Sequence, residues 1–263
     1  MASNLEYNED ESRRTEQAYL SPEIVRQRER TLAIINPARG ERVVDVGCGP
    51  GLLALELSAA VGEKGRVIGI DSSSAMIGLA EKRCGNLPNV ELHDGDATDL
   101  NLDDASTDVV CCTQVLLYVS DHEKAIAEMF RVLKPGGRVV VMETDWRSAV
   151  LHSTDEDLTE KIIAAWDNAV PSPRLPARLG SLLKKAGFKS VQIDAIPNIS
   201  TSCEKGGFSM SMMEQCAQAA TEQGIFTEKE GNEWLASLMQ LGEDDAYFFC
   251  VNRFLFSAVK SSS

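Results

Sequence analysis

The segment Val43-Val44-Asp45-Val46-Gly47-Cys48-Gly49-Pro50-Gly51 decides the fold of this chain. A short apolar run such as its first four residues predicts a buried strand that ends in a tight turn. Glycine at every second position from 47 to 51 supplies the turn, because glycine has no Cβ, adopts positive φ and lets a ligand approach its backbone. Strong helix formers follow at residues 52–57. Strand, glycine turn and helix in this order are typical of a nucleotide-binding βαβ unit.

The spacing of the glycines distinguishes two kinds of loop. A dinucleotide fingerprint requires G-x-G-x-x-G, and its third glycine, counted from Gly47, would fall on Leu52. The chain instead has D-x-G-x-G-x-G, with Asp45 two residues before the first glycine. This pattern resembles the first motif of the class I S-adenosylmethionine (SAM) methyltransferases. The resemblance covers residues 43–141 and is strongest to the ubiquinone/menaquinone C-methyltransferase-like group of small-molecule enzymes.

Strand and helix patterns alternate along most of the chain, which predicts an α/β fold with a mostly parallel sheet. The predicted strands are 43–46, 66–70, 90–93, 108–112, 138–142 and 190–193, with extended stretches at 247–251 and 254–258. The predicted helices are 15–35, 52–61, 73–83, 121–133, 154–169, 176–186, 208–223 and 227–241. The resemblance implies a Rossmann-like class I methyltransferase fold. Its sheet would have seven strands, mostly parallel, with an antiparallel C-terminal strand and helical insertions that cover the active site.

A length of 263 residues suits one sizeable core, so we expect a single methyltransferase domain over 1–263. Within it we expect an N-terminal helical cap at 1–40 and a SAM-binding core at 41–145. Acceptor-side helices and a lid would occupy 146–245, and the C-terminal strand 246–260. The sequence does not indicate an oligomeric state.

Charge and cysteine usage exclude several classes of function. The net charge of −14 argues against nucleic-acid binding, because proteins hold nucleic acid with clusters of basic residues. No apolar run approaches the roughly 18 residues of a membrane span, and the polar N-terminus has no secretory h-region. Seven scattered cysteines without CxxC pairs indicate a reducing compartment, and three distant histidines do not predict a metal site. We therefore predict a cytoplasmic protein without a metal.

The predicted glycine loop precedes a helix, where free backbone N–H groups and the positive end of the helix dipole suit an anion. The resemblance implies that this anion is the carboxylate of the SAM methionine portion, bound at Gly47, Cys48, Gly49 and Gly51. Asp45 would then lie near the amino group of the same portion. The alternative is that Asp45 only orders the loop by hydrogen bonding.

Acidic residues follow the second and third predicted strands. Asp71 ends the second strand, where a carboxylate can accept hydrogen bonds from both ribose hydroxyls; the alternative is a helix cap or a turn, and the position after the second strand favours ribose. The resemblance places Ser72 and Met76 near the adenine. It also implies that Asp96 accepts a hydrogen bond from the adenine amino group while the backbone of Ala97 donates to the ring, although this dipeptide is also a common turn.

Four further positions are candidates for the active site. Thr113 follows the fourth predicted strand, at the sheet edge where open α/β sheets bind ligands, and we expect it to contact the cofactor; Gln114 would face the acceptor. Tyr19 either closes over the cofactor, as in similar enzymes, or makes a core contact. His152 is the catalytic candidate, needed as a base only if the acceptor is a poorly acidic hydroxyl or carbon.

Two late helices are rich in apolar residues that suit either an ordinary core or a flexible lid. These residues are Phe208, Met210, Met212, Met213 and Met239. We predict SAM-dependent methyl transfer to a small, partly apolar organic acceptor at oxygen, nitrogen or carbon. The alternative is a protein that binds SAM without transferring its methyl group. A nicotinamide-dependent dehydrogenase is disfavoured by Leu52 and by the absence of a Tyr-x-x-x-Lys set.

Overall fold

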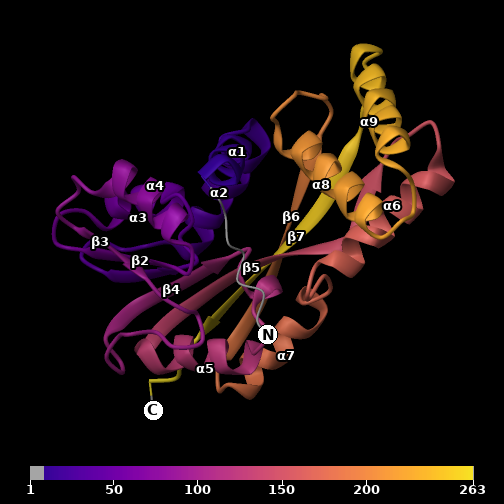
Figure 1. Cartoon of the computed structure of the whole chain (residues 1–263). Helices are drawn as coiled ribbons and strands as arrows, with labels where there is room; N and C mark the ends of the chain where they lie inside the picture. Colours follow the sequence, from indigo (N-terminus) through magenta and orange to yellow (C-terminus); the bar gives the residue numbers. More distant parts are fainter. Residues whose placement is uncertain (1–8, 263) are drawn as a thin grey trace.

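In the computed structural model, which describes residues 9–262, a seven-stranded sheet has the order β3-β2-β1-β4-β5-β7-β6 (Figure 1). The strands are β1 (Arg42–Val46), β2 (Arg66–Asp71), β3 (Val90–Asp94), β4 (Thr107–Thr113), β5 (Leu133–Leu151), β6 (Lys189–Ser200) and β7 (Phe249–Val259). Strands β1 to β5 pair in parallel, whereas β7 is antiparallel to both of its neighbours. The predicted fold class, a mostly parallel sheet with an antiparallel C-terminal strand, is confirmed.

Helices cover both faces of the sheet. They are α1 (Glu9–Tyr19), α2 (Pro22–Ile35), α3 (Leu52–Val61), α4 (Ser74–Cys84), α5 (His122–Val132), α6 (Glu156–Ala169), α7 (Pro176–Lys185), α8 (Phe208–Glu222) and α9 (Glu228–Glu243), with a 3₁₀ turn η1 (Leu116–Tyr118). Figure 1 shows α5 and α7 below the sheet, and α6, α8 and α9 gathered around the far ends of β5 and β7. Within residues 9–262, none of the helices combines the length and the apolar character needed to cross a membrane.

The buried apolar residues form three clusters. The first two clusters lie on opposite faces of the sheet, because successive side chains of β1 point to opposite faces. Val44 and Val46 face α5 and α7, while Val43 faces α2 and α3. The third cluster lies beyond the sheet edge, where Trp146 and Phe249 meet the buried faces of α6, α8 and α9. This third cluster supplies the wall of the molecule next to the carboxyl ends of β4 and β5.

Strand β5 is longer than the sequence predicts. The apolar run ends at Met142, but the backbone continues to pair with β7 through Asp145 and again from Val150 to Leu151. Polar residues at 143–145 interrupt the apolar pattern without interrupting the ladder. The two extended stretches predicted near the C-terminus are both extended, and they join through Asn252 and Arg253 into the single strand β7.

Three other boundaries differ from the prediction. Strand β6 runs from Lys189 to Ser200, well beyond the predicted 190–193. The helix predicted over 15–35 is divided into α1 and α2 at Leu20 and Ser21, just before Pro22; residues 1–8 of the predicted cap lie outside the described residues. Strand β5 begins at Leu133 and not at residue 138, and its ladder with β4 passes irregularly from Leu133 to Arg138.

The sequence left two interpretations for the apolar side chains of the two late helices, an ordinary core or a lid. Most of these side chains are buried. Phe208 and the methionines of α8 at 210, 212 and 213 are between 1% and 7% exposed and belong to the third cluster. Met239 of α9 is 45% exposed. The packing of α8 is that of a core helix, while α9 keeps one methionine at the surface.

Candidate active site

The glycine loop follows β1 and is held against the end of β2. Gly47, Gly49 and Gly51 all have positive φ, at 72°, 53° and 78°. The Gly47 N–H donates to the carbonyl of Ile70 at 2.7 Å. A Cβ on Gly47 would overlap the side chain of Val115, whereas a Cβ on Gly49 would meet nothing within 4 Å. Packing therefore requires glycine at 47, and Gly49 faces open space.

Asp71 joins the end of β2 to this loop. Its Oδ2 accepts from the Gly49 N–H at 2.8 Å, and its Oδ1 accepts from the Ser73 N–H at 2.9 Å. Burial raises the pKa of Asp71, although the two backbone donors oppose that shift. Each carboxylate oxygen retains a further lone pair, so Asp71 can order the loop and still accept from a ligand hydroxyl.

Asp45 lies beneath the loop in the middle of the sheet. It is 1% exposed, its Oδ1 accepts from the Cys111 thiol at 3.4 Å, and its Oδ2 has no hydrogen-bond partner. Burial raises its pKa to about 7. Within the described chain, the side-chain hydrogen bond of Asp45 joins it to β4 and not to the glycine loop. A role in ordering the loop therefore does not explain its unpartnered oxygen.

The raised pKa of Asp45 predicts a pH-dependent stability. Its ordinary pKa is 3.8, so the folded state binds the extra proton and the resulting stabilisation is lost as the pH rises from about 4 to about 7. Near pH 8 we expect ligand-free Asp45→Asn to be more stable than the parent protein by about 1–3 kcal/mol, and near pH 5 by much less. Urea unfolding at both pH values measures this. A stability difference independent of pH would contradict it.

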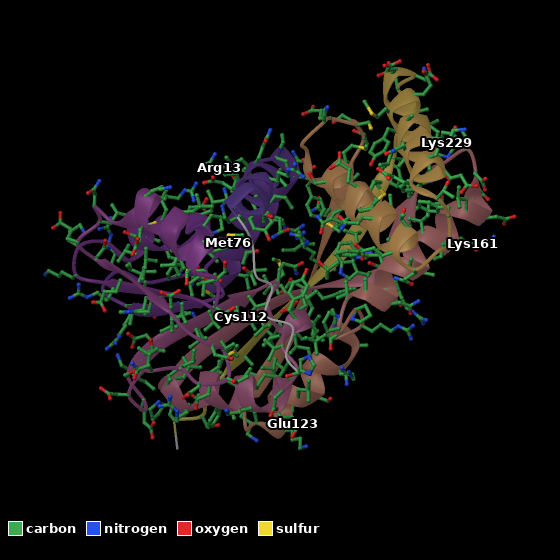
Figure 2. All side chains as sticks on the ribbon, in the orientation of Figure 1. Arg13, Met76, Cys112, Glu123, Lys161 and Lys229 are labelled. Atoms are coloured by element: carbon green, nitrogen blue, oxygen red, sulfur yellow. The ribbon has the colours of Figure 1, made fainter. Side chains whose placement is uncertain are left out.

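The other residues predicted around the cofactor lie beside the loop. Ser72 is exposed, and the side chain of Cys48 is buried. Met76 is 3% exposed in the first turn of α4, where its N–H donates to the capping Ser73. In the view of Figure 2, Met76 lies between Arg13 of α1 and Cys112 of β4, near the middle of the molecule.

The turn after β3 reaches the same edge. The Gly95 N–H donates to the Asp71 carbonyl at 3.0 Å, which holds this turn beside β2. Asp96 is exposed and accepts from the Thr98 N–H at 2.7 Å, while Ala97 is 9% exposed. The turn geometry and the predicted adenine contact are compatible, because the carboxylate keeps free lone pairs.

Thr113 is the last residue of β4 and pairs with Met142 of β5. The next residue, Gln114, has a positive φ of 59°, its N–H donates to the Met142 carbonyl at 2.8 Å, and its side-chain oxygen accepts from Thr144. A non-glycine residue held in this region stores about 1–3 kcal/mol of strain, which is common at functional sites.

Tyr19 ends α1 next to Asp71. Burial raises the pKa of Tyr19, and Asp71 adds to the shift while Arg253 opposes it. Helix α1 is held there by Arg83, which pairs with Glu16 and donates to the carbonyl of Pro50. Tyr19 thus lies at the loop and also packs against the third cluster.

The structure leaves His152 apart from these residues. It is exposed, and its backbone N–H donates to the Phe248 carbonyl at 2.9 Å, beyond the end of β5. Within the predicted acceptor-side segment 146–245, Arg147 and Arg174 both pair with Asp167. The geometry therefore gives His152 no partner of the kind a general base uses, and its catalytic role stays a prediction.

Glu143 is a site residue that sequence reasoning missed. It is fully buried, and its Oε1 accepts from the N–H groups of Val115 and Leu116 at 3.1 and 2.7 Å. Its Oε2 has no hydrogen-bond partner among residues 9–262, and burial raises its pKa to about 8. The available signal was an acid directly after an apolar strand, at the carboxyl end where ligands bind.

Arg253 of β7 was also missed. It is 3% exposed, donates from Nη1 to Gln27 and lies 4.7 Å from the centre of the Phe208 ring, while its Nε has no partner in the described part of the chain. Burial lowers its pKa to about 10. Its signal was a charged residue at an inward position of an alternating aromatic strand.

Residues 44–141, which contain the loop, β2 to β4 and the start of β5, match the methyltransferase domain family. This segment is therefore similar to a methyltransferase domain. The resemblance drawn from the glycine spacing is therefore confirmed. A demethylmenaquinone methyltransferase of Staphylococcus epidermidis is 41% identical over 117 residues, which are 44% of this chain and 48% of that protein.

An uncharacterised 37.1 kDa transposon protein of Streptomyces fradiae is 41% identical over 150 residues, 57% of this chain and 44% of its own. The chain thus spans less than half the length of both curated relatives. Two solved structures share the methyltransferase fold. The phosphoethanolamine N-methyltransferase 2 of Haemonchus contortus, bound to phosphomonomethylethanolamine and S-adenosylhomocysteine, has a TM-score of 0.64 at 21% identity, covering 97% of this chain and 58% of that one. The [4+2]-cyclase SpnF has a TM-score of 0.56 at 23% identity, covering 90% and 81%.

Proposed function

We propose that the methyltransferase domain binds SAM and transfers its methyl group to a small, partly apolar organic acceptor. The observation that carries this is the hydrogen bond from Gly49 to Asp71 beside the unpartnered Oδ2 of Asp45. It joins an open glycine backbone and two carboxylates at the carboxyl edge of the sheet. This edge offers N–H donors for a carboxylate, and acceptors for an ammonium group and for ribose hydroxyls.

The chain's own groups would act mainly by positioning. Bound SAM would supply an activated methyl group on a sulfonium, and in-line displacement depends on holding the nucleophile close and aligned. Thr113 and the strained Gln114 stand at the edge between the loop and the third cluster. Tyr19 would exclude water from one side, since it lies between Asp71 and that cluster.

Charge supports the acceptor class. A net charge of −14 repels polyanions, so we infer a small molecule and not nucleic acid. Two relatives point the same way by name, one a demethylmenaquinone and the other a phosphoethanolamine methyltransferase. A cytoplasmic location belongs to this proposal.

The second candidate is a SAM-binding protein without methyl transfer. The observation that favours it is the shared fold of SpnF, which is described as a [4+2]-cyclase. The same cofactor edge would then stabilise or orient another reaction. The two candidates share cofactor binding and differ only in turnover.

Calorimetry and a labelled-methyl assay test the proposal. We expect low-micromolar or tighter binding of SAM and S-adenosylhomocysteine and no binding of NAD, because the loop lacks the third glycine of the dinucleotide fingerprint. Incubation of the protein with methyl-labelled SAM and small-molecule extracts should then move label into an organic product. Binding of NAD in place of SAM would overturn both candidates, whereas SAM binding without label transfer to any extract would favour the second.

A further inference from the structure

Arg253 is a buried cation without a carboxylate in contact. Among residues 9–262 its polar and ring partners are the Gln27 side chain and the Phe208 ring, and its Nε–H points to no acceptor. A buried guanidinium ordinarily has an ion-pair partner, because removing it from water without one is unfavourable by several kcal/mol. The missing partner has to be explained.

The nearest acids do not neutralise Arg253. Glu143 of β5 affects the pKa of Arg253 but makes no ion pair with it among the described residues; its Oε1 is already bonded to two backbone N–H groups, and burial raises its pKa, which favours the neutral carboxyl. Glu23 of α2 has the smallest effect on the pKa of Arg253, and its carboxylate accepts a hydrogen bond from the Ser200 hydroxyl. The remaining groups that face Arg253 are the phenols of Tyr19 on α1 and Tyr118 on η1.

These groups connect Arg253 to the glycine loop. Charges on Tyr19, Glu143 and Arg253 affect the pKa of Tyr118. Charges on Arg253 and Asp71 likewise affect the pKa of Tyr19. Arg253 and Asp71 both affect the pKa of Tyr19, so the three side chains lie in the same part of the molecule. Its other side is apolar, since Phe208 packs on Phe249 in the third cluster.

An opening lies close to the same place. A cavity of about 200 Å³ is bounded by α2, the end of β6 and the start of α8, and Glu23, Gly207 and Ser209 are among its lining residues. Gly207 and Ser209 flank Phe208 in the sequence, and the guanidinium of Arg253 lies over the Phe208 ring. Neither Phe208 nor Arg253 is among the lining residues, so the cavity comes within one residue of the aromatic wall without opening onto it.

We propose that Arg253 binds a planar oxyanion of the methyl acceptor, a carboxylate or a phenolate-type oxygen on an aromatic or otherwise apolar body. The free Nε–H and the guanidinium plane match such an oxygen in charge and shape. Phe208 and the third cluster hold the apolar body, and Tyr19 separates the acceptor from Asp71. This inference rests on the proposed function, because the oxyanion would belong to the acceptor of the same domain.

The test uses calorimetry with two matched probe pairs on the full chain saturated with S-adenosylhomocysteine. Naphthoate against naphthamide examines a carboxylate, and nitrophenolate against nitroanisole examines a phenolate. At least one anion should bind, and about 10-fold or more tighter than its neutral partner. Arg253→Met should remove that preference and leave S-adenosylhomocysteine affinity unchanged. Whichever pair shows the preference identifies the oxyanion.

Stability separates binding from a structural role. Because Arg253→Met removes an uncompensated buried charge, its melting temperature should be unchanged or higher. The matched control is Arg138→Met on β5, where Arg138 pairs with Glu41 and bonds the carbonyl of Ile35; this variant should melt lower and keep the anion preference. If S-adenosylhomocysteine binds but neither anion is preferred, or if Arg253→Met melts lower with its preference intact, the inference is wrong. If S-adenosylhomocysteine does not bind at all, the proposed function itself fails.

Discussion

Replacing Gly49 by valine should weaken SAM binding by at least about 30-fold while the protein remains folded. Gly49 has a φ of 53°, and a Cβ there would meet nothing within 4 Å of the chain. A side chain would therefore occupy the space in front of the loop backbone, where the proposed ligand approaches. Calorimetric titration of SAM into both proteins measures the change.

A matched variant separates the lost approach from backbone strain. Gly40 has a φ of 88° and an equally open Cβ position, but it lies before β1 at the opposite end of that strand. Gly40→Val imposes similar strain, of about 1–2 kcal/mol, without touching the loop. Gly40→Val should melt lower and bind SAM normally. Equal SAM affinity in both variants would remove the loop from the binding site.

The sequence predicts the nucleotide-binding half of the fold well, because local and global signals agree there. The apolar strand, the alternating glycines and the strong helix formers place β1, the loop and α3 within a residue of their true bounds. Asp71 is likewise found at a strand end, since strand order alone brings it beside the loop. Its bond to Gly49 shows why that spacing works.

The acceptor side could not be predicted in the same way. Glu143 and Arg253 interrupt apolar strands, so pattern analysis ends β5 early and divides β7. Their burial depends on pairing between β5 and β7, which are separated in sequence by α6 to α9. His152 shows the converse: its residue type suggested chemistry, but its place at an exposed strand end offers it no partner. Tertiary contacts decide whether such a residue is buried and which partners it has, and the local sequence pattern does not contain that information.

Asp71→Ala should weaken SAM binding by about 2–4 kcal/mol, or about 30-fold to 1,000-fold. The substitution removes acceptors for ligand hydroxyls and also frees the Gly49 N–H, so the loop loses the contact that holds it to β2. Asp71→Asn keeps one side-chain oxygen and should lose less, since a single neutral acceptor replaces two charged ones. The order of affinities, parent above asparagine above alanine, is the expected calorimetric result.

Asp94 provides the control for this series. It is the register partner of Asp71 on β3, it is exposed, and it accepts from the Ser74 hydroxyl at 2.9 Å rather than from the loop. Asp94→Ala removes a carboxylate from the same edge of the sheet and should leave SAM affinity within about 3-fold of the parent, because exposed charges contribute little. If Asp94→Ala weakens binding as much as Asp71→Ala, the effect belongs to the summed charge of the edge and not to the bond between Asp71 and Gly49. If only Asp71→Ala weakens binding, the strand-end acid acts through the loop, as its geometry indicates.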